Sequence, residues 1–310
     1  MFEKFYHNMN EVIIGKESTI KKLLIVLLSE GHILIEDVPG VGKTTIAKAL
    51  AYSIEGSFAR IQFTPDLLPS DILGVSIFNQ KTSAFEYKKG PIFNQIILAD
   101  EINRTSPKTQ SSLLEAMEER QVTIDGITYK LQEPFMVIAT QNPVEYEGTF
   151  ALPEAQLDRF MMKIEIGYPD REVELKIFNK IKNGISPEEI KPTLISEEIS
   201  KMIKEVNNVF TSEEIEKYIF EIIANTRKSN EVELGCSPRA AIQLYKCAKA
   251  KAFIENRNFV IPSDIKSLAV DVLSHRIIIK PEIKYKNKSE RDVIKDIVLK
   301  TKAPKVIEYD

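Results

Sequence analysis

Seven consecutive residues have the types and the spacing of a loop that binds the phosphates of a nucleotide. They are Pro39, Gly40, Val41, Gly42, Lys43, Thr44 and Thr45. Gly40 and Gly42 have no side chains to block a phosphate, so successive backbone N–H groups can point at its oxygens. Lys43 would reach the β- and γ-phosphates, and the Thr44 hydroxyl would bind Mg²⁺. The segment therefore predicts a site for ATP and Mg²⁺.

The segments on either side of this loop agree with that prediction. Residues 32–35 form a short apolar run typical of a buried strand, and residues 45–52 have helical periodicity. The strict pattern G-x-x-x-x-G-K-[ST] has glycine where this chain has Asp37, and aspartate does not adopt every glycine conformation. The order strand, loop, helix supports the motif despite this departure.

Two acidic residues, Asp100 and Glu101, end the apolar run 96–99. Paired carboxylates at the tip of a buried strand repel each other, and a bound cation would offset this repulsion and their desolvation. We expect Asp100 to hold Mg²⁺ through its water shell and Glu101 to orient or deprotonate the water that attacks the γ-phosphate. The structural alternative is a pair of acids at a helix N-terminus. The position downstream of a phosphate loop favours the catalytic interpretation.

Strand and helix patterns alternate through the first half of the chain, which predicts an α/β fold with a parallel sheet. With residues 32–35, about five strands are expected. The others are at residues 59–63, 94–100, 135–140 and 163–166. Residues 74–89 and 121–131 interrupt the alternation and are predicted to be hairpins, the second around Asp125-Gly126, a dipeptide suited to a tight turn.

Beyond residue 170 the pattern changes to Glu, Lys and Ile at helical spacing, and strand patterns stop. We therefore expect a nucleotide-binding α/β core over residues 1–185 and a helical domain over residues 186–310. Turn-forming residues at 183–187 favour a boundary there.

The composition of the chain indicates which kinds of partner and which cellular location to expect. A chain of 310 residues that is 43% hydrophobic is long enough to bury a core. A net charge of -3 provides no basic field that would attract nucleic acid or an anionic membrane. Two cysteines, Cys236 and Cys247, are too few for a disulfide framework. The histidines are too dispersed along the sequence for a metal site, and we expect His32 to be structural. The first residues lack a signal-peptide pattern, and no apolar run reaches bilayer length. We expect a cytoplasmic protein.

Five further segments carry a more specific pattern. They are ILADEINR at residues 97–104, PKTQSSLLEAMEERQV at 107–122, ATQNP at 139–143, LPEAQLDRF at 152–160 and SPR at 237–239. With the phosphate loop, they closely resemble the MoxR family of AAA+ ATPases, and the match spans nearly the whole chain. Asp37 is usual in that family's loop. In family terms the phosphate loop is the Walker A motif, and Asp100 and Glu101 belong to Walker B.

The resemblance assigns roles that the patterns alone do not. Asn142 resembles the sensor 1 residue that positions the attacking water, although Asn-Pro alone indicates only a turn. Arg159 corresponds to the arginine finger that reaches the nucleotide of a neighbouring subunit, although an arginine near a helix end is often only favourable to the helix dipole. Arg239 resembles the sensor 2 arginine, with Ser237 and Pro238 at the helix start. The alternative is an exposed arginine on a surface helix. Arg104 is a weaker candidate for an interface arginine.

The resemblance also implies an AAA+ core with a five-stranded parallel sheet, a C-terminal helical lid, and ATP between the subunits of a ring that is commonly a hexamer. The hairpins at residues 74–89 and 121–131 correspond to the helix-2 insertion and the insertion before sensor 1. Such loops often face substrate in ring motors. Alternation along the first hairpin favours Phe78, Phe85 and Tyr87 as packing contacts over residues that grip a substrate.

The function implied by the resemblance is ATP hydrolysis coupled to chaperone-like remodelling or maturation of protein partners, with von Willebrand factor A domain proteins as expected partners. A DNA-directed AAA+ motor is one alternative, but it needs a basic pore or an added DNA-binding domain, and the acidic balance argues against it. A magnesium-chelatase-like ATPase subunit is another. A nucleotide switch without turnover is disfavoured by Glu101. The sequence does not identify the client.

Overall fold

A computed structural model describes residues 2–38, 40–143, 149–182 and 190–304. The described residues fall into two compact units, one within the ranges 1–159 and 164–200 and the other within the ranges 160–163 and 201–310. The predicted domain boundary at residues 185 and 186 lies outside the described residues. None of the described helices combines the length and the apolar composition that crossing a bilayer requires.

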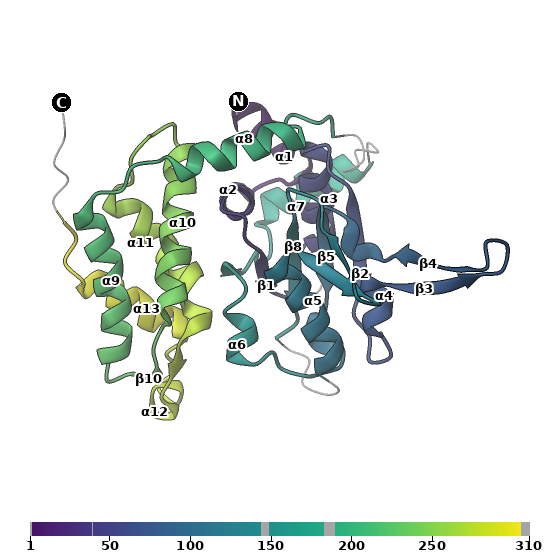
Figure 1. Ribbon diagram of the computed structural model, residues 1–310. Coiled ribbons are helices and arrows are strands. Elements are labelled where there is room, and N and C mark those ends of the chain that lie inside the picture. Colours follow the sequence, from purple (N-terminus) through teal and green to yellow (C-terminus); the bar gives the residue numbers. More distant parts are fainter. Residues whose placement is uncertain (1, 39, 144–148, 183–189, 305–310) are drawn as a thin grey trace. The chain divides into compact units, whose positions relative to one another are not determined.

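The first unit is built on a five-stranded parallel sheet with the order β2-β5-β8-β1-β9 (Figure 1). The strands are β1 (Ile33–Glu36), β2 (Phe58–Gln62), β5 (Ile96–Asp100), β8 (Met136–Gln141) and β9 (Met162–Ile164). Residues 96–99 are fully buried, as expected for a parallel strand that is covered on both faces. The predicted α/β fold is confirmed, and each predicted strand is present with ends that differ by at most two residues.

Helices connect and cover these strands. They are α1 (Phe2–Val12), α2 (Glu17–Leu28), α3 (Lys43–Ser53), α4 (Pro69–Leu73), α5 (Pro107–Glu119), α6 (Glu154–Leu157) and α7 (Arg171–Lys182), with short 3₁₀ turns η1 (Pro91–Phe93) and η2 (Ile102–Arg104). Helix α2 buries every residue from Leu23 to Leu28, so it lies within the core of this unit rather than on its surface.

Both predicted hairpins form, one from β3 (Gly74–Asn79) and β4 (Ala84–Lys89), the other from β6 (Gln121–Ile124) and β7 (Ile127–Lys130). The first extends away from the sheet in Figure 1. At its base, Gly74 has a φ of 108°, and a Cβ there would lie 2.3 Å from the Lys88 carbonyl oxygen, so only glycine fits.

The hairpin aromatics divide into two groups. The Tyr87 ring lies 4.6 Å from the Tyr129 ring of the second hairpin, so the predicted packing role of Tyr87 is confirmed. The prediction is wrong for Phe78 and Phe85, which contact each other but are 54% and 75% exposed. Alternation places all three on one face, but the second hairpin covers only the part of that face near the base.

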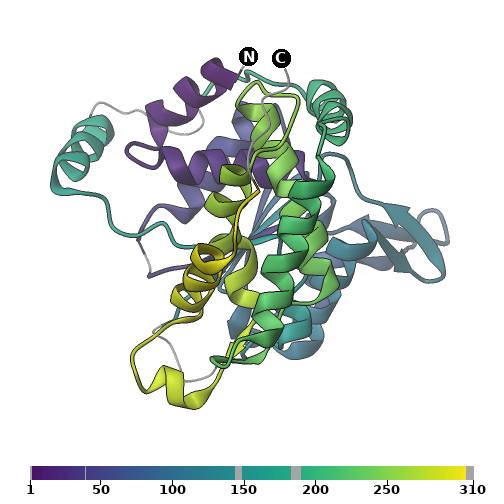
Figure 2. The same ribbon diagram turned by 90° about the vertical axis from the view of Figure 1, so that its left-hand side faces the viewer.

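The second unit is mainly helical. Its elements are α8 (Ser196–Asn207, shared with the first unit), α9 (Glu213–Lys228), β10 (Val232–Leu234), α10 (Pro238–Ile254), α11 (Pro262–Leu273), η4 (Ser274–Arg276), β11 (Ile278–Ile279), α12 (Pro281–Lys284) and α13 (Glu290–Lys300). Helices α9, α10, α11 and α13 pack against one another (Figures 1 and 2). The expectation that strands stop after residue 170 is wrong, because β10 pairs with β11. These strands are too short to produce a periodic pattern.

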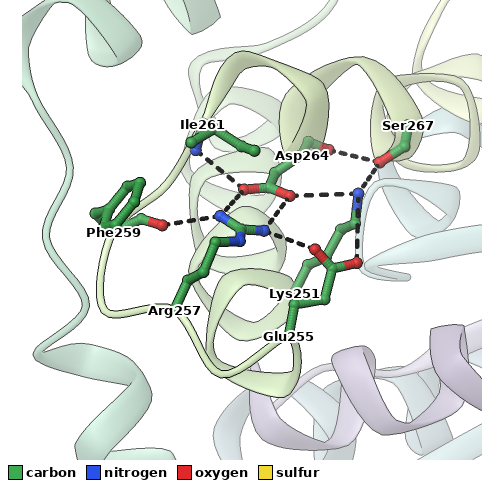
Figure 3. Close-up of polar contacts among 7 residues, drawn as sticks. All are labelled: Lys251, Glu255, Arg257, Phe259, Ile261, Asp264 and Ser267. Carbon is green, nitrogen blue, oxygen red and sulfur yellow. Dashed lines mark hydrogen bonds and ion pairs between the residues drawn. The ribbon is translucent and has the colours of Figure 1, made fainter. Parts of the chain in front are cut away.

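A buried carboxylate fixes the connection between α10 and α11 (Figure 3). Asp264, whose side chain is 1% exposed, accepts two hydrogen bonds from Arg257 at 2.7 and 2.8 Å and one from the Ile261 N–H at 3.0 Å. The Lys251 ammonium lies 3.3 Å from the same carboxylate. Arg257 also donates to the Phe259 carbonyl oxygen at 2.9 Å, so the guanidinium holds the loop that leads into α11.

Asp264→Asn should destabilise the helical unit by about 2–4 kcal/mol, because it leaves two cations near an amide that cannot balance their charge. Amide hydrogen exchange in α10 and α11 would measure the loss. Glu213→Gln, which removes an exposed ion pair with Lys217 at 2.7 Å, is the control and should leave exchange unchanged. Equal protection in the Asp264 and Glu213 variants would contradict this account.

Candidate active site

The carboxyl ends of β1, β5 and β8 meet at one edge of the sheet. Parallel pairing aligns Leu34 with Ala139 and Ala99 with Ala139, so the residues that follow these strands must lie together. Asp37 follows β1, and its N–H donates to the Gln141 carbonyl oxygen at 3.1 Å. Asp100 ends β5, and Asn142 follows β8. This edge is where open α/β sheets bind ligands.

The predicted phosphate loop joins this edge to the N-terminus of α3. Gly40 and Gly42 have φ angles of 88° and 87°, which favour glycine, and Gly42 is the N-cap residue of α3. A Cβ added at either glycine would meet nothing within 4 Å, so open space lies beside the loop. Pro39 lies outside the described residues. In the described part of the loop, Val41, Thr44 and Thr45 are half-buried. Free N–H groups at a helix start favour an anion.

Lys43 is the first residue of α3 and lies among acidic groups. Its ammonium donates to the Asp37 carbonyl oxygen at 2.6 Å. Partial burial lowers the pKa of Lys43, although the negative charges of Asp100, Asp37 and Glu101 act to raise it. The influence of these carboxylates on the ammonium shows that the structure brings the loop lysine and both strand-end acids together.

Asp37 has a structural role that the strict motif did not predict. Its Oδ2 accepts hydrogen bonds from the N–H groups of Ile166 and Gly167 at 2.7 and 2.6 Å, and its Oδ1 accepts one from the Val38 N–H at 2.8 Å. Glycine has no side chain that could do this. The carboxylate therefore ties the start of the phosphate loop to the turn after β9.

The same turn is held from its other side by Lys16. The Lys16 ammonium donates to the carbonyl oxygens of Ile166, Gly167 and Tyr168 at 2.7, 3.0 and 3.2 Å. One cation thus satisfies the acceptors of this turn while one anion satisfies its donors. The backbone around the phosphate loop is fixed by charge-assisted hydrogen bonds.

The carboxylate of Asp100 is oriented by residues on the two neighbouring strands. Thr140 of β8 donates its hydroxyl to Asp100 Oδ1 at 2.7 Å. Arg60 of β2 donates to Oδ2 at 2.6 and 3.1 Å. Sequence reasoning missed both partners. Arg60 and Thr140 lie on the two strands that flank β5, which becomes visible only once the sheet order is known.

Glu101 is the residue immediately after β5 and has a left-handed backbone, with a φ of 58°. Its N–H donates to the Thr140 hydroxyl at 2.8 Å. Its carboxylate accepts hydrogen bonds from Gln62 at 2.8 Å and Arg104 at 3.1 Å. Arg104 thus contacts Glu101 within the same chain, and Gln62 is a second partner that the sequence analysis did not identify. Gln62 and Arg60 lie two residues apart on β2, a spacing that places both side chains on one face.

Three further residues, Asn142, Arg159 and Arg239, were predicted to act at this site. Asn142 is 6% exposed and follows β8 directly. Arg159 follows α6, and its guanidinium forms an ion pair with Glu118 of α5 at 3.2 Å. Arg239 is the second residue of α10, in the other unit, behind Pro238 as predicted. The catalytic roles of these three residues stay predictions.

The donor set at this edge fits Mg²⁺ bound together with a nucleotide. No group of at least three His, Cys, Asp or Glu side chains among the described residues could form a protein-only metal cage. Mg²⁺ is commonly held by one or two carboxylates with substrate phosphates and water. Asp100, next to the lysine of the phosphate loop, is such a ligand, and the Thr44 hydroxyl lies in the first turn of α3.

Comparisons with known proteins agree with the geometry. Residues 32–162 match the ATPase family associated with various cellular activities (AAA), and residues 224–297 match the AAA lid domain. The chain is 39% identical to the chaperone MoxR1 of Mycobacterium tuberculosis, over 89% of this chain and 75% of that protein. It is 50% identical to the uncharacterised protein YeaC of Bacillus subtilis, over 97% and 94% of the two chains.

A solved structure extends this similarity to the whole fold. It is the crystal structure of a provisionally assigned ATPase from Cytophaga hutchinsonii, with 44% sequence identity and a TM-score of 0.92. The alignment covers 98% of this chain and 95% of that one, so both units have counterparts there.

Asp37→Gly should destabilise the protein even though it restores the strict phosphate-loop pattern. The change leaves the Ile166 and Gly167 N–H groups without their acceptor, and we expect a loss of about 2–3 kcal/mol in unfolding free energy. Urea unfolding followed by circular dichroism would measure it. Asp37→Asn keeps one acceptor oxygen and should lose less. A Gly variant as stable as the parent would show that this tether is unimportant.

Proposed function

The chain belongs to the MoxR family of AAA ATPases, and we propose that it hydrolyses ATP in a ring of identical subunits to remodel or mature protein partners. The observation that supports this most strongly is the glycine loop at the start of α3, with Lys43 beside both Asp100 and Glu101. Phosphate binding and water activation require these groups at one place.

Different residues of the first unit are proposed to bind the phosphates of ATP and the Mg²⁺ ion. The N–H groups of residues 40–45 and the Lys43 ammonium bind the phosphates, and the Thr44 hydroxyl and the Asp100 carboxylate hold Mg²⁺. Mg²⁺, when bound with ATP, neutralises part of the charge on the phosphate oxygens. The Lys43 ammonium gives one of its three N–H donors to the Asp37 carbonyl oxygen, which leaves two donors for a phosphate oxygen.

Glu101 is the group that we propose to orient or deprotonate the attacking water, with Asn142 positioning the same water. Gln62 and Arg104 hold the Glu101 carboxylate at 2.8 and 3.1 Å. These two hydrogen bonds limit the rotation of the carboxylate. We propose that Arg239 of the lid contacts the γ-phosphate of the same subunit.

Arg159 provides the reason to propose a ring. In this chain its guanidinium is paired with Glu118, and an arginine finger acts from a neighbouring subunit. The ion pair is partly exposed, with side chains 29% and 36% accessible, so its loss costs little when a phosphate of a neighbour becomes the alternative partner. We propose a hexamer that works with von Willebrand factor A domain proteins, which family membership supports.

Glu101→Gln should bind ATP and fail to hydrolyse it, because the amide cannot accept the proton of the water. Lys43→Ala should lose ATP binding, because no other side chain of the loop carries a positive charge. Calorimetric titration with Mg²⁺ and ATP, beside phosphate-release assays, separates the two effects. Wild-type hydrolysis by the Glu101 variant would remove this residue from the mechanism.

The ATPase rate per subunit should rise with protein concentration and fall by about 10³-fold or more in Arg159→Ala, because the finger is supplied in trans. Glu118→Ala, which removes only the partner of Arg159 within the chain, is the matched control and should remain active. A rate that is independent of concentration, together with wild-type activity of Arg159→Ala, would contradict the ring mechanism.

The client is identified by a different measurement. Affinity purification of Glu101→Gln in the presence of ATP should retain protein partners that the Lys43→Ala variant does not. If both variants retain the same proteins, binding of those partners does not depend on the nucleotide state, which contradicts ATP-coupled remodelling.

A further inference from the structure

The helical unit includes a short piece of chain from far earlier in the sequence. Residues 160–163 belong to this unit, while the residues before and after them, through Arg159 and from Ile164, belong to the first unit. Phe160 and Met162 are fully buried. The first residue of this piece is joined by a peptide bond to Arg159, the predicted arginine finger.

Two buried side chains of η4 hold the beginning of this piece. The His275 Nε2 atom lies 3.0 Å from the Phe160 carbonyl oxygen and donates to it. Arg276 donates to the same oxygen and, at 3.3 Å, to the Met161 carbonyl oxygen. His275 and Arg276 are 6% and 7% exposed, so these bonds form away from solvent.

The helical unit in turn fixes Arg276. Its guanidinium donates to the Val272 carbonyl oxygen of α11 and to the Gln243 side-chain oxygen of α10. Gln243 is 8% exposed. A planar guanidinium with partners on several sides has little freedom to move, so the position of the Phe160 carbonyl follows that of α10 and α11.

His275 is a neutral donor in this arrangement. Its burial and the nearby charge of Arg276 place the pKa of His275 well below the usual value, so it carries one ring proton near neutral pH. The carbonyl acceptor at Nε2 selects the tautomer with that proton on Nε2.

From this geometry we propose that His275 and Arg276 are positioning residues for Arg159, which they influence through the Phe160 carbonyl. The Cα atoms of neighbouring residues are about 3.8 Å apart, so a displaced Phe160 also displaces the base of the Arg159 side chain. On the other side, the Arg159 N–H donates to the Gln156 carbonyl oxygen at 3.2 Å. His275 and Arg276 therefore help to set where the same subunit directs Arg159 toward a neighbour.

This inference rests on the proposed trans role of Arg159, and mixed rings test the two separately. Arg159→Ala subunits keep an intact site but give no finger, whereas Glu101→Gln subunits give a finger but have an inactive site. A mixture of the two should hydrolyse ATP faster than either alone. If the mixture is inactive, the trans finger and the inference both fail, and the fault lies in the proposed function.

The positioning role predicts an asymmetry between the two partners. His275→Leu removes the ring donor. Placed in the Glu101→Gln subunit, which gives the finger, it should lower the activity of the mixture about tenfold or more, because a misplaced catalytic group loses much of its effect. Placed in the Arg159→Ala subunit, it should leave the activity of the mixture within about twofold.

A purely structural role would not produce this asymmetry, because a damaged lid would harm the subunit that hydrolyses ATP at least as much. Equal losses in the two arrangements, or no loss in either, would overturn the proposal. His275→Gln retains an N–H donor and should restore most of the activity in the finger-giving subunit. If His275→Leu does not fold, Arg276→Lys replaces it in both arrangements, with the same asymmetry expected.

Discussion

The parallel pairing of β1, β5 and β8 is the constraint on which the rest of the site depends. Buried apolar strands in fixed register leave their carboxyl ends at one edge, and the polar residues that follow them must occupy the same small volume. Lys43 and three carboxylates meet there. The surrounding hydrogen bonds satisfy these charges: Asp37 binds backbone N–H groups, while Asp100 and Glu101 bind side chains from β2 and β8 or the following turn.

Strand β9 lies at the edge of the sheet beside β1, and residues from different parts of the sequence hold the chain on either side of it. The turn after it is held by Asp37 and Lys16, which belong to the same unit as the phosphate loop. The residues before it are held by His275 and Arg276 of the helical unit. A strand of three residues is thus fastened at both ends by buried or half-buried charged and polar groups.

The sequence predicted the sheet and the phosphate loop because their determinants are local. Apolar runs such as residues 96–99 and the glycine spacing at 40 and 42 can be recognised without knowing what surrounds them. Arg60, Gln62 and Thr140 could not be found in that way, because their meaning comes from strand order. The exposure of Phe78 and Phe85 depends on how far a second hairpin reaches, which alternation does not encode. His275 and Arg276 contact a carbonyl 115 or more residues away, beyond any periodic pattern.

The central claim is that a site formed at the sheet edge of one subunit is completed by the Arg159 of another. Determining the structure of the Glu101→Gln protein with ATP and Mg²⁺ by electron cryomicroscopy tests it most directly. The account predicts a closed ring in which each Arg159 has left Glu118 and its guanidinium contacts the γ-phosphate of a neighbouring subunit. A ring with ATP at every phosphate loop and every Arg159 still paired with its own Glu118 would contradict it.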